Sequence, residues 1–246
     1  MIETSTFNTV IGKFDMLESF RGQLYKRALS LIENNKKHGI EGVEAFVDAY
    51  VLILATWNSG YMRYVMGGKY EDFHATLEKA ELKLKSLEGK EFQNMDFSAN
   101  NKENTQIKDV FDKLKDNEMI RYTGASKIMH LRLPKLFVMW DRFIGEDYEK
   151  DGAGYLKFLK DMKNKFSSIP FKEEEHHTFA KAVDEYNYIT ITIPKLQEAN
   201  IRDLKKKISD PKTKPSKLPE LKSRLSEAEN EYKDHKDWLA KVHAIN

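Results

Sequence analysis

Apolar residues recur at steps of three and four along most of this chain, a spacing typical of amphipathic α-helices. The pattern covers residues 14–34, 42–64, 70–87 and 106–115, and these segments are also rich in Glu, Lys, Leu and Ala. A chain of 246 residues has ample apolar material for a sizeable core. The sequence therefore predicts a mostly α-helical protein.

The composition changes near Pro194, and we predict a boundary there between a helical core at 1–194 and a C-terminal segment at 195–246. Just before it, the alternating β-branched residues at 188–193 indicate a short strand or an extended exit from the core. Beyond it the chain is strongly charged, and three of the six prolines fall within DPKTKPSKLP.

Mostly apolar residues near the C-terminus follow alternating steps of four and three, as in a coiled-coil seam or a helical hairpin. They are Leu221, Leu225, Ala228, Tyr232, His235, Leu239 and Val242. We expect this helix to pair with residues 196–208, forming an antiparallel C-terminal helical hairpin across the proline–lysine loop. A homodimer through the same seam is the alternative.

Charge and cysteine content exclude several classes of function. The formal net charge is only +2, so any surface for nucleic acid must be a local patch. Without cysteine there is no disulfide, thiolate nucleophile, zinc finger or iron–sulfur cluster. The N-terminus lacks a secretory pattern, and the uncharged stretch at 49–62 is shorter than the roughly 20 residues of a membrane span. We expect a cytoplasmic protein without membrane association.

The segment at 120–145, IRYTGASKIMHLRLPKLFVMWDRFIG, combines a glycine, a short helical stretch, a proline and an isolated acid. A turn is expected at 123–125, because glycine tolerates positive φ. A helix of about two turns at 126–133 would stop at Pro134. The apolar residues 136–140 would then deliver Asp141 to the start of the next helix, which its side chain can cap.

These residues resemble the helix-hairpin-helix DNA glycosylase superfamily, through Gly-x-x-Lys at a turn, a following helix, a proline-led apolar segment and Asp. In bifunctional members of that family a lysine attacks the sugar C1′ and an aspartate stabilises the developing charge. The resemblance implies that Lys127 is the nucleophile and Asp141 the aspartate, in a DNA-repair glycosylase and abasic-site lyase that needs no cofactor. The chain departs from the family pattern in having one hairpin glycine and a shorter interval between the two residues. The LFVMWD and DEYNY segments also resemble uncharacterised archaeal proteins.

DNA is the partner that the resemblance implies, held by a local basic patch and by backbone amides at the turn. The expected contacts are Arg121, Thr123, Gly124, Ala125, Arg132, Lys135 and Arg142. Aromatic and amide side chains are candidates for a pocket that holds a flipped base. They are Trp57, Asn58, Tyr61 and Trp140.

Each of these assignments has a structural alternative. Lys127 can be a solvated helix residue, Asp141 a helix cap, and the aromatic residues core. The alternative function is a non-catalytic helical interaction protein that uses its hairpin to bind a partner or itself. No metal is expected, because adjacent histidines in the EEEHH run at 173–177 would point about 100° apart on a helix. The glycines at 152–154 are expected to form a loop.

Overall fold

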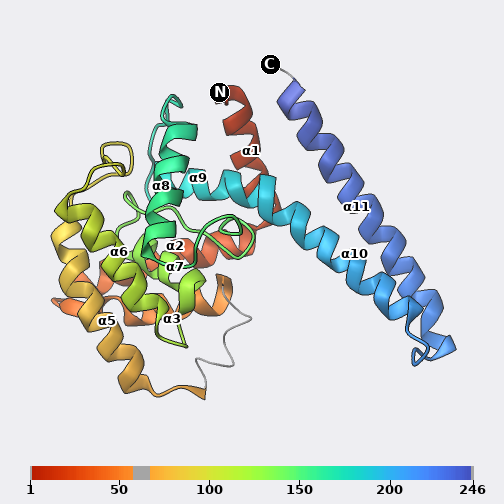
Figure 1. The fold of residues 1–246 in the computed structure, drawn as a ribbon, viewed down its shortest axis with the longest axis horizontal. Helices are drawn as coiled ribbons and strands as arrows, with labels where there is room; N and C mark the ends of the chain where they lie inside the picture. Colours follow the sequence, from red (N-terminus) through yellow and green to blue (C-terminus); the bar gives the residue numbers. More distant parts are fainter. Residues whose placement is uncertain (1, 58–66, 245–246) are drawn as a thin grey trace.

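The computed structural model describes residues 2–57 and 67–244, and within these ranges the chain is mostly α-helical and contains no β-strand (Figure 1). The helices are α1 (Thr4–Leu17), α2 (Ser19–Lys37), α3 (Val47–Trp57), α5 (Tyr70–Leu84), α6 (Lys102–Lys115), α7 (Arg121–Arg132), α8 (Gly152–Phe166), α9 (Phe179–Asn187), α10 (Ile193–Ser209) and α11 (Leu218–Ala244). Short 3-10 turns lie at Gly42–Ala45, Lys85–Leu87 and Pro215–Lys217. In the described part of the chain, none of the helices combines the length and apolar character needed to cross a bilayer.

Helix α7 lies at the centre of the core, packed against α3 and α6. Every residue from 123 to 132 is buried, and α7 includes several polar residues. A helix covered on all sides needs no polar face, so its apolar residues need not follow an amphipathic stripe. This explains why the sequence of the central helix shows only a weak amphipathic pattern.

The predicted turn at 123–125 is wrong. These residues lie inside α7, which begins at Arg121, two residues before the expected turn, and runs without interruption to Arg132. Tertiary packing on all sides outweighs the local preference of glycine for a turn. The predicted stop is correct, because the helix ends before Pro134.

The glycines at 152–154 also lie in a helix rather than in the expected loop. Asp151 caps the start of α8 by accepting the amide of Gly154 at 2.8 Å. A Cβ at Gly152 would lie 2.3 Å from the carbonyl oxygen of Lys108 on α6. Glycine therefore allows the backbones of α6 and α8 to approach closely.

The residues expected to form a short strand or an extended exit from the core instead form a π-helical turn, Tyr188–Thr192, which joins α9 to α10 in one continuous helical run. The amide of Ile193 bonds to the carbonyl of Tyr188, five residues back. Pro194 has no amide hydrogen to give to the next carbonyl, that of Ile189. His235 of α11 occupies this position, with its Nε2 at 3.0 Å from the Ile189 oxygen.

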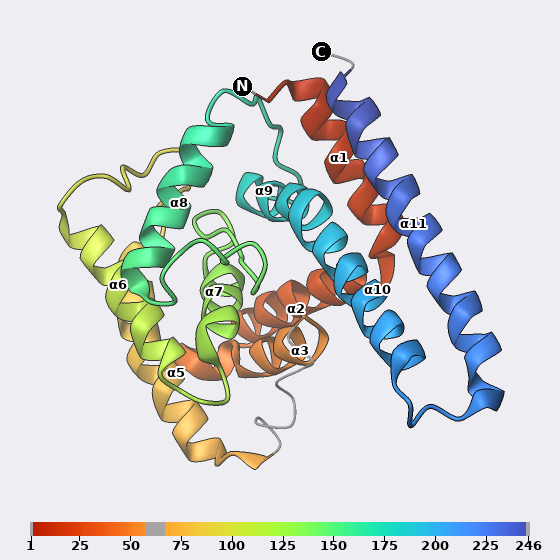
Figure 2. The same cartoon turned by 45° about the vertical axis from the view of Figure 1, so that its right-hand side comes forward.

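Helices α10 and α11 lie side by side as an antiparallel hairpin that projects away from the rest of the fold (Figure 1). The end of α11 returns to the core and lies beside α1 (Figure 2), where the Thr6 hydroxyl donates to the Val242 carbonyl. Residue 194 lies within the helical run rather than at a break, so the core and the hairpin share one continuous helix.

We predict that Gly152→Ala lowers the free energy of unfolding by about 2 kcal/mol or more, because the new methyl group would collide with the backbone of α6. Gly22→Ala on α2 is the matched control, since a Cβ there meets no atom within 4 Å. It should leave stability unchanged or raise it by up to about 1 kcal/mol. Urea denaturation of both variants tests this, and equal stability of the two would contradict the close approach.

Candidate functional site

The candidate site is built around residues 136–140, a buried stretch that is neither helix nor strand. Buried backbone groups outside regular structure still need hydrogen-bond partners. Side chains from neighbouring helices provide them here. Tyr155 of α8 donates to the Val138 carbonyl at 2.8 Å, and Thr178, the cap of α9, donates to the Pro134 carbonyl at 2.6 Å.

Ser126 and His130 of α7 bind the two ends of this stretch. The Ser126 hydroxyl accepts the Trp140 amide at 3.2 Å and lies 3.1 Å from the Trp140 carbonyl. His130 Nδ1 lies 2.5 Å from the Phe137 carbonyl and therefore carries the proton. Its Nε2 accepts the Tyr25 hydroxyl at 2.7 Å. Burial lowers the pKa of His130 to about 3, so the ring is neutral.

Lys127 belongs to the same set of contacts. Only 3% of the residue is exposed, and its Nζ lies 3.3 Å from the carbonyl oxygens of both Thr123 and Trp140. Burial lowers the pKa of Lys127, although Asp141 and Asp184 oppose this effect. The amine is thus directed at backbone carbonyls inside the core, and its role as a nucleophile stays a prediction.

Asp141 lies at the end of the buried stretch and is held by three hydrogen bonds. Its Oδ1 accepts the amides of Phe143 and Ile144 at 2.7 and 2.9 Å, which is the expected capping geometry, although a turn follows rather than a helix. Its Oδ2 accepts the Thr192 hydroxyl at 2.6 Å. The carboxylate therefore ties the loop to the start of the hairpin.

Two of the basic residues predicted to contact DNA are paired with carboxylates. Arg132 is buried, bonds to Glu81 at 2.7 Å and also pairs with Glu88. Lys135 is exposed and lies 2.9 Å from Glu173. Phosphate binding by either residue would have to displace these acids.

The other predicted DNA contacts fall into two groups. Arg121 and Arg142 are exposed, and the Arg142 guanidinium lies 4.4 Å from the centre of the Phe143 ring. Thr123, Gly124 and Ala125 are buried within α7. Their amides belong to a helix and not to an exposed hairpin turn. The loop that was expected to bind phosphate is therefore not formed by these residues.

The residues predicted to form a base pocket lie in different settings. Trp140 has 0% exposure, and its indole nitrogen donates to the Tyr122 carbonyl at 3.1 Å, so it is part of the core. Trp57 stacks on Phe14 with ring centres 5.7 Å apart. Asn58 and Tyr61 lie outside the described residues.

A buried ionic cluster on α9 lies next to these aromatic rings. The Lys181 amine lies 3.1 Å from Asp184 and 3.2 Å from Glu185, and it faces the Phe14 ring at 4.5 Å. Burial raises the pKa of Asp184 to about 6 despite the Lys181 charge. For Glu185 burial acts to raise the pKa, but Lys181 and His177 together outweigh it and the pKa is lowered. No signal in the sequence identified Lys181 as the cation of this cluster.

The EEEHH run forms a tight turn, so the helical argument against a metal site does not apply. His176 adopts a positive φ of 62°, and Glu174 pairs with His177 through their backbones. Glu33 of α2 approaches His176 Nδ1 at 3.8 Å, whereas Glu175 approaches its Nε2 at 3.8 Å. The two acids face opposite ring nitrogens, which is poor geometry for one ion, since a metal binds a single ring nitrogen.

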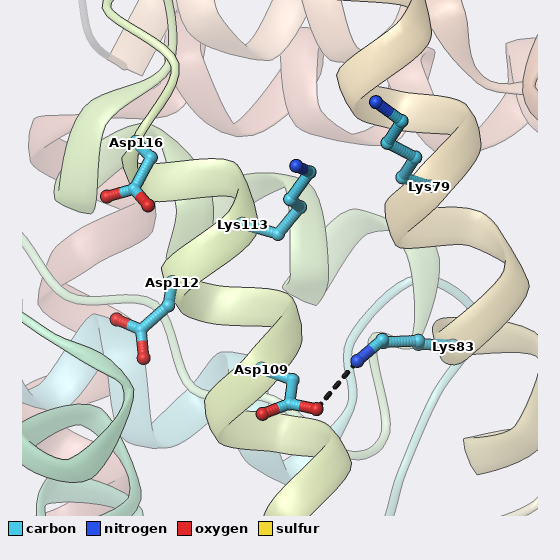
Figure 3. A pocket seen from close by; sticks show the side chains of 6 residues that line it. All are labelled: Lys79, Lys83, Asp109, Asp112, Lys113 and Asp116. Atoms are coloured by element: carbon cyan, nitrogen blue, oxygen red, sulfur yellow. Dashed lines mark hydrogen bonds and ion pairs between the residues drawn. The ribbon is translucent and has the colours of Figure 1, made fainter.

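Two open pockets are lined entirely by described residues, and Lys127 lines neither. The larger, of about 370 Å³, lies between α5 and α6 (Figure 3). Its lining consists of three lysines and three aspartates, and Lys83 bonds to Asp109 at 2.6 Å. The second, of about 320 Å³, is lined by residues of the polar segment 89–103. Neither contains the combination of apolar walls and converging polar groups that is usual for a small-molecule site.

Comparison with known proteins gave no family model, no curated protein and no solved structure that matches this chain. The relationship to helix-hairpin-helix glycosylases therefore stays a prediction.

We predict that His130 makes stability depend on pH in the acid range. The unfolded chain binds a proton near pH 6.5, whereas the folded ring stays neutral to about pH 3, so stability falls as the pH drops below 6.5. Between pH 7 and pH 5 the wild type should lose about 2 kcal/mol more than His130→Gln.

Denaturant unfolding of both proteins at the two pH values measures this difference. Asp184 acts in the opposite direction, because its raised pKa favours the folded state as the pH falls through 6. It is present in both proteins, so its effect cancels in the difference. Equal losses in the two proteins would show that His130 is not held neutral by burial.

Proposed function

We propose that this chain is a non-catalytic interaction protein that binds a partner through its C-terminal helical hairpin. The observation that carries the proposal is the projection of the hairpin beyond the core (Figure 1). In residues 202–227 only Leu204 is fully buried. We call the part of the hairpin at 199–230 the arm. An element with so little buried surface adds little to a hydrophobic core. Its projection from the core therefore favours a role in contact with another molecule.

The arm is joined to the core by a continuous helix and by side-chain contacts at its base. Helix α9 is buried along its whole length and continues through the π-helical turn into α10. At its base, His235 bonds to the Ile189 carbonyl and Tyr232 bonds to Glu198. A partner held by the arm would therefore be held in a fixed orientation relative to the core.

The contacts around residues 136–140 support a non-catalytic reading of the Lys127 region. Its side chains bind backbone groups of the same chain, and each has a structural partner. Buried polar groups need such partners for stability alone, so these contacts require no catalytic explanation.

A homodimer through the hairpin seam is a further possibility for the same arm, and the contacts within the chain weigh against it. All seven seam residues from Leu221 to Val242 are buried or half-buried against α10 and the core. Dimerisation through this seam would require the hairpin to open. We therefore expect a monomer in sedimentation at micromolar concentration.

The second candidate is a DNA glycosylase and abasic-site lyase with Lys127 as the nucleophile and Asp141 stabilising the sugar. The observation in its favour is that burial lowers the pKa of Lys127, which favours the neutral amine that Schiff-base chemistry needs. The charge of Asp141 also acts on Lys127, but it raises the pKa of the amine and so opposes this effect. For this function the contacts of Lys127 with Thr123 and Trp140 would have to open.

Borohydride trapping with abasic-site DNA separates the two candidates. The non-catalytic proposal predicts no covalent complex, because the Lys127 amine is enclosed in the core. A complex that forms with the wild type and is lost in Lys127→Ala would overturn this proposal and establish the lyase. Circular dichroism must show that the variant is folded.

Shortening the arm tests whether it is separate from the core. Glu198 and Tyr232 are hydrogen-bonded to each other, so residues 199–230 can be replaced by a short Gly-Ser turn between neighbouring ends. We predict that the shortened protein stays folded, with its melting temperature changed by no more than about 4 °C. Loss of cooperative unfolding would show that the arm is part of the core and would overturn the proposal.

A further inference from the structure

We propose that the tip of the arm binds the sugar–phosphate backbone of nucleic acid. This inference rests on the proposed function and names the partner of the arm. Nine of the 41 basic residues and three of the 39 acidic residues lie within 202–224, so this stretch has a formal charge of +6. The remaining residues of the chain carry −4. The positive charge of the protein is thus concentrated at the end of a projecting element.

Most of this charge is not neutralised within the protein. Each acid of the stretch already interacts locally: Asp203 with Lys207 at 2.5 Å, Asp210 with the amide of Lys212 at 2.8 Å, and Glu220 with Arg224 at 4.0 Å. The basic residues of the stretch that form no ion pair with a described residue are Arg202, Lys206, Lys212, Lys214, Lys217 and Lys222, and all are exposed.

The positions of these residues suit a polyanion. Lys212, Lys214 and Lys217 lie in and beside the loop that joins the two helices, while Lys206 is in the last turn of α10 and Lys222 near the start of α11. Charge is therefore present on both helices and on the loop between them. A row of phosphates can meet several of these side chains at once, whereas a single small anion meets one or two.

The tip lacks the features of a membrane-binding element. Surface helices that enter a bilayer present exposed apolar side chains beside their basic ones. No large apolar side chain is exposed anywhere in the described stretch 202–224, and Leu218 and Leu221 are half-buried in the hairpin. Basic side chains without apolar neighbours favour binding to solvent-exposed phosphates over insertion into a bilayer. Binding of this kind positions a nucleic acid without reading its sequence.

The experiment compares two variants of the full-length protein with equal net charge. In the tip variant Lys212, Lys214 and Lys217 become glutamine. In the control variant Lys79, Lys85 and Lys113, which are exposed on α5, on the adjoining 3-10 turn and on α6, become glutamine. Fluorescence anisotropy with a short mixed-sequence DNA duplex, titrated over a range of salt concentrations, gives the affinity and its salt dependence.

We expect the tip variant to bind about tenfold or more weakly at low salt. Its slope of log affinity against log salt should be smaller by up to about 2.7, if each lysine contacts one phosphate. The control variant should bind as the wild type does. Equal weakening of both variants, or no binding of the duplex by the wild type, would overturn the inference.

Vesicles containing phosphatidylserine serve as the second probe, and a wild type that binds vesicles but not the duplex would also overturn it. If any of these outcomes occurs while the shortened-arm protein remains folded, the inference about nucleic acid fails but the proposed function is unaffected. Misfolding of the shortened protein would instead remove the proposed function itself.

Discussion

The buried, irregular stretch at 136–140 is the constraint around which this fold is arranged. Its backbone is excluded from water and has neither a helix nor a sheet to satisfy it, so each polar group needs a side-chain partner at a defined position. Ser126, Lys127 and His130 of α7 supply several of these partners, with Tyr155 of α8. Helix α7 therefore carries polar side chains because they hydrogen-bond to the backbone of residues 136–140. The same requirement explains why a lysine and a histidine are buried next to one another.

The features of this fold that depend on contacts between distant parts of the chain could not be predicted from the sequence. Apolar spacing correctly indicated a mostly helical chain. Pro194, where we expected a domain boundary, lies within a continuous helical run. The alternating β-branched residues before it pointed to a strand, yet they form a π-helical turn, because the helices on both sides and the contacts of α11 outweigh β-propensity. Gly124 suggested a turn for the same local reason. The partners of Lys127 are main-chain carbonyls, which leave no mark in the sequence, so its burial could not be predicted from residue types.

The cations of the core and those of the arm lie in different surroundings. Inside, Lys181 is surrounded by carboxylates and aromatic rings, and Arg132 is paired with acids from α5 and the segment after it. These cations belong to buried ionic clusters, in which the cost of removing the charges from water offsets much of their attraction. At the tip of the arm the lysines lack such acids and lie in water. The contrast assigns a structural role to the first group, and we propose recognition for the second. The expectation that recognition centres on residues 120–145 stays a prediction.

The free energy of unfolding of Ser126→Ala tests the central claim most directly. This change removes the acceptor for the buried Trp140 amide, whereas Ser30→Ala on α2 removes only a bond to a carbonyl of its own helix, that of Lys26. If the side chains of α7 hold the buried stretch in place, Ser126→Ala should cost about 1–3 kcal/mol and Ser30→Ala should cost nothing measurable. Equal stability of the two variants would contradict the account.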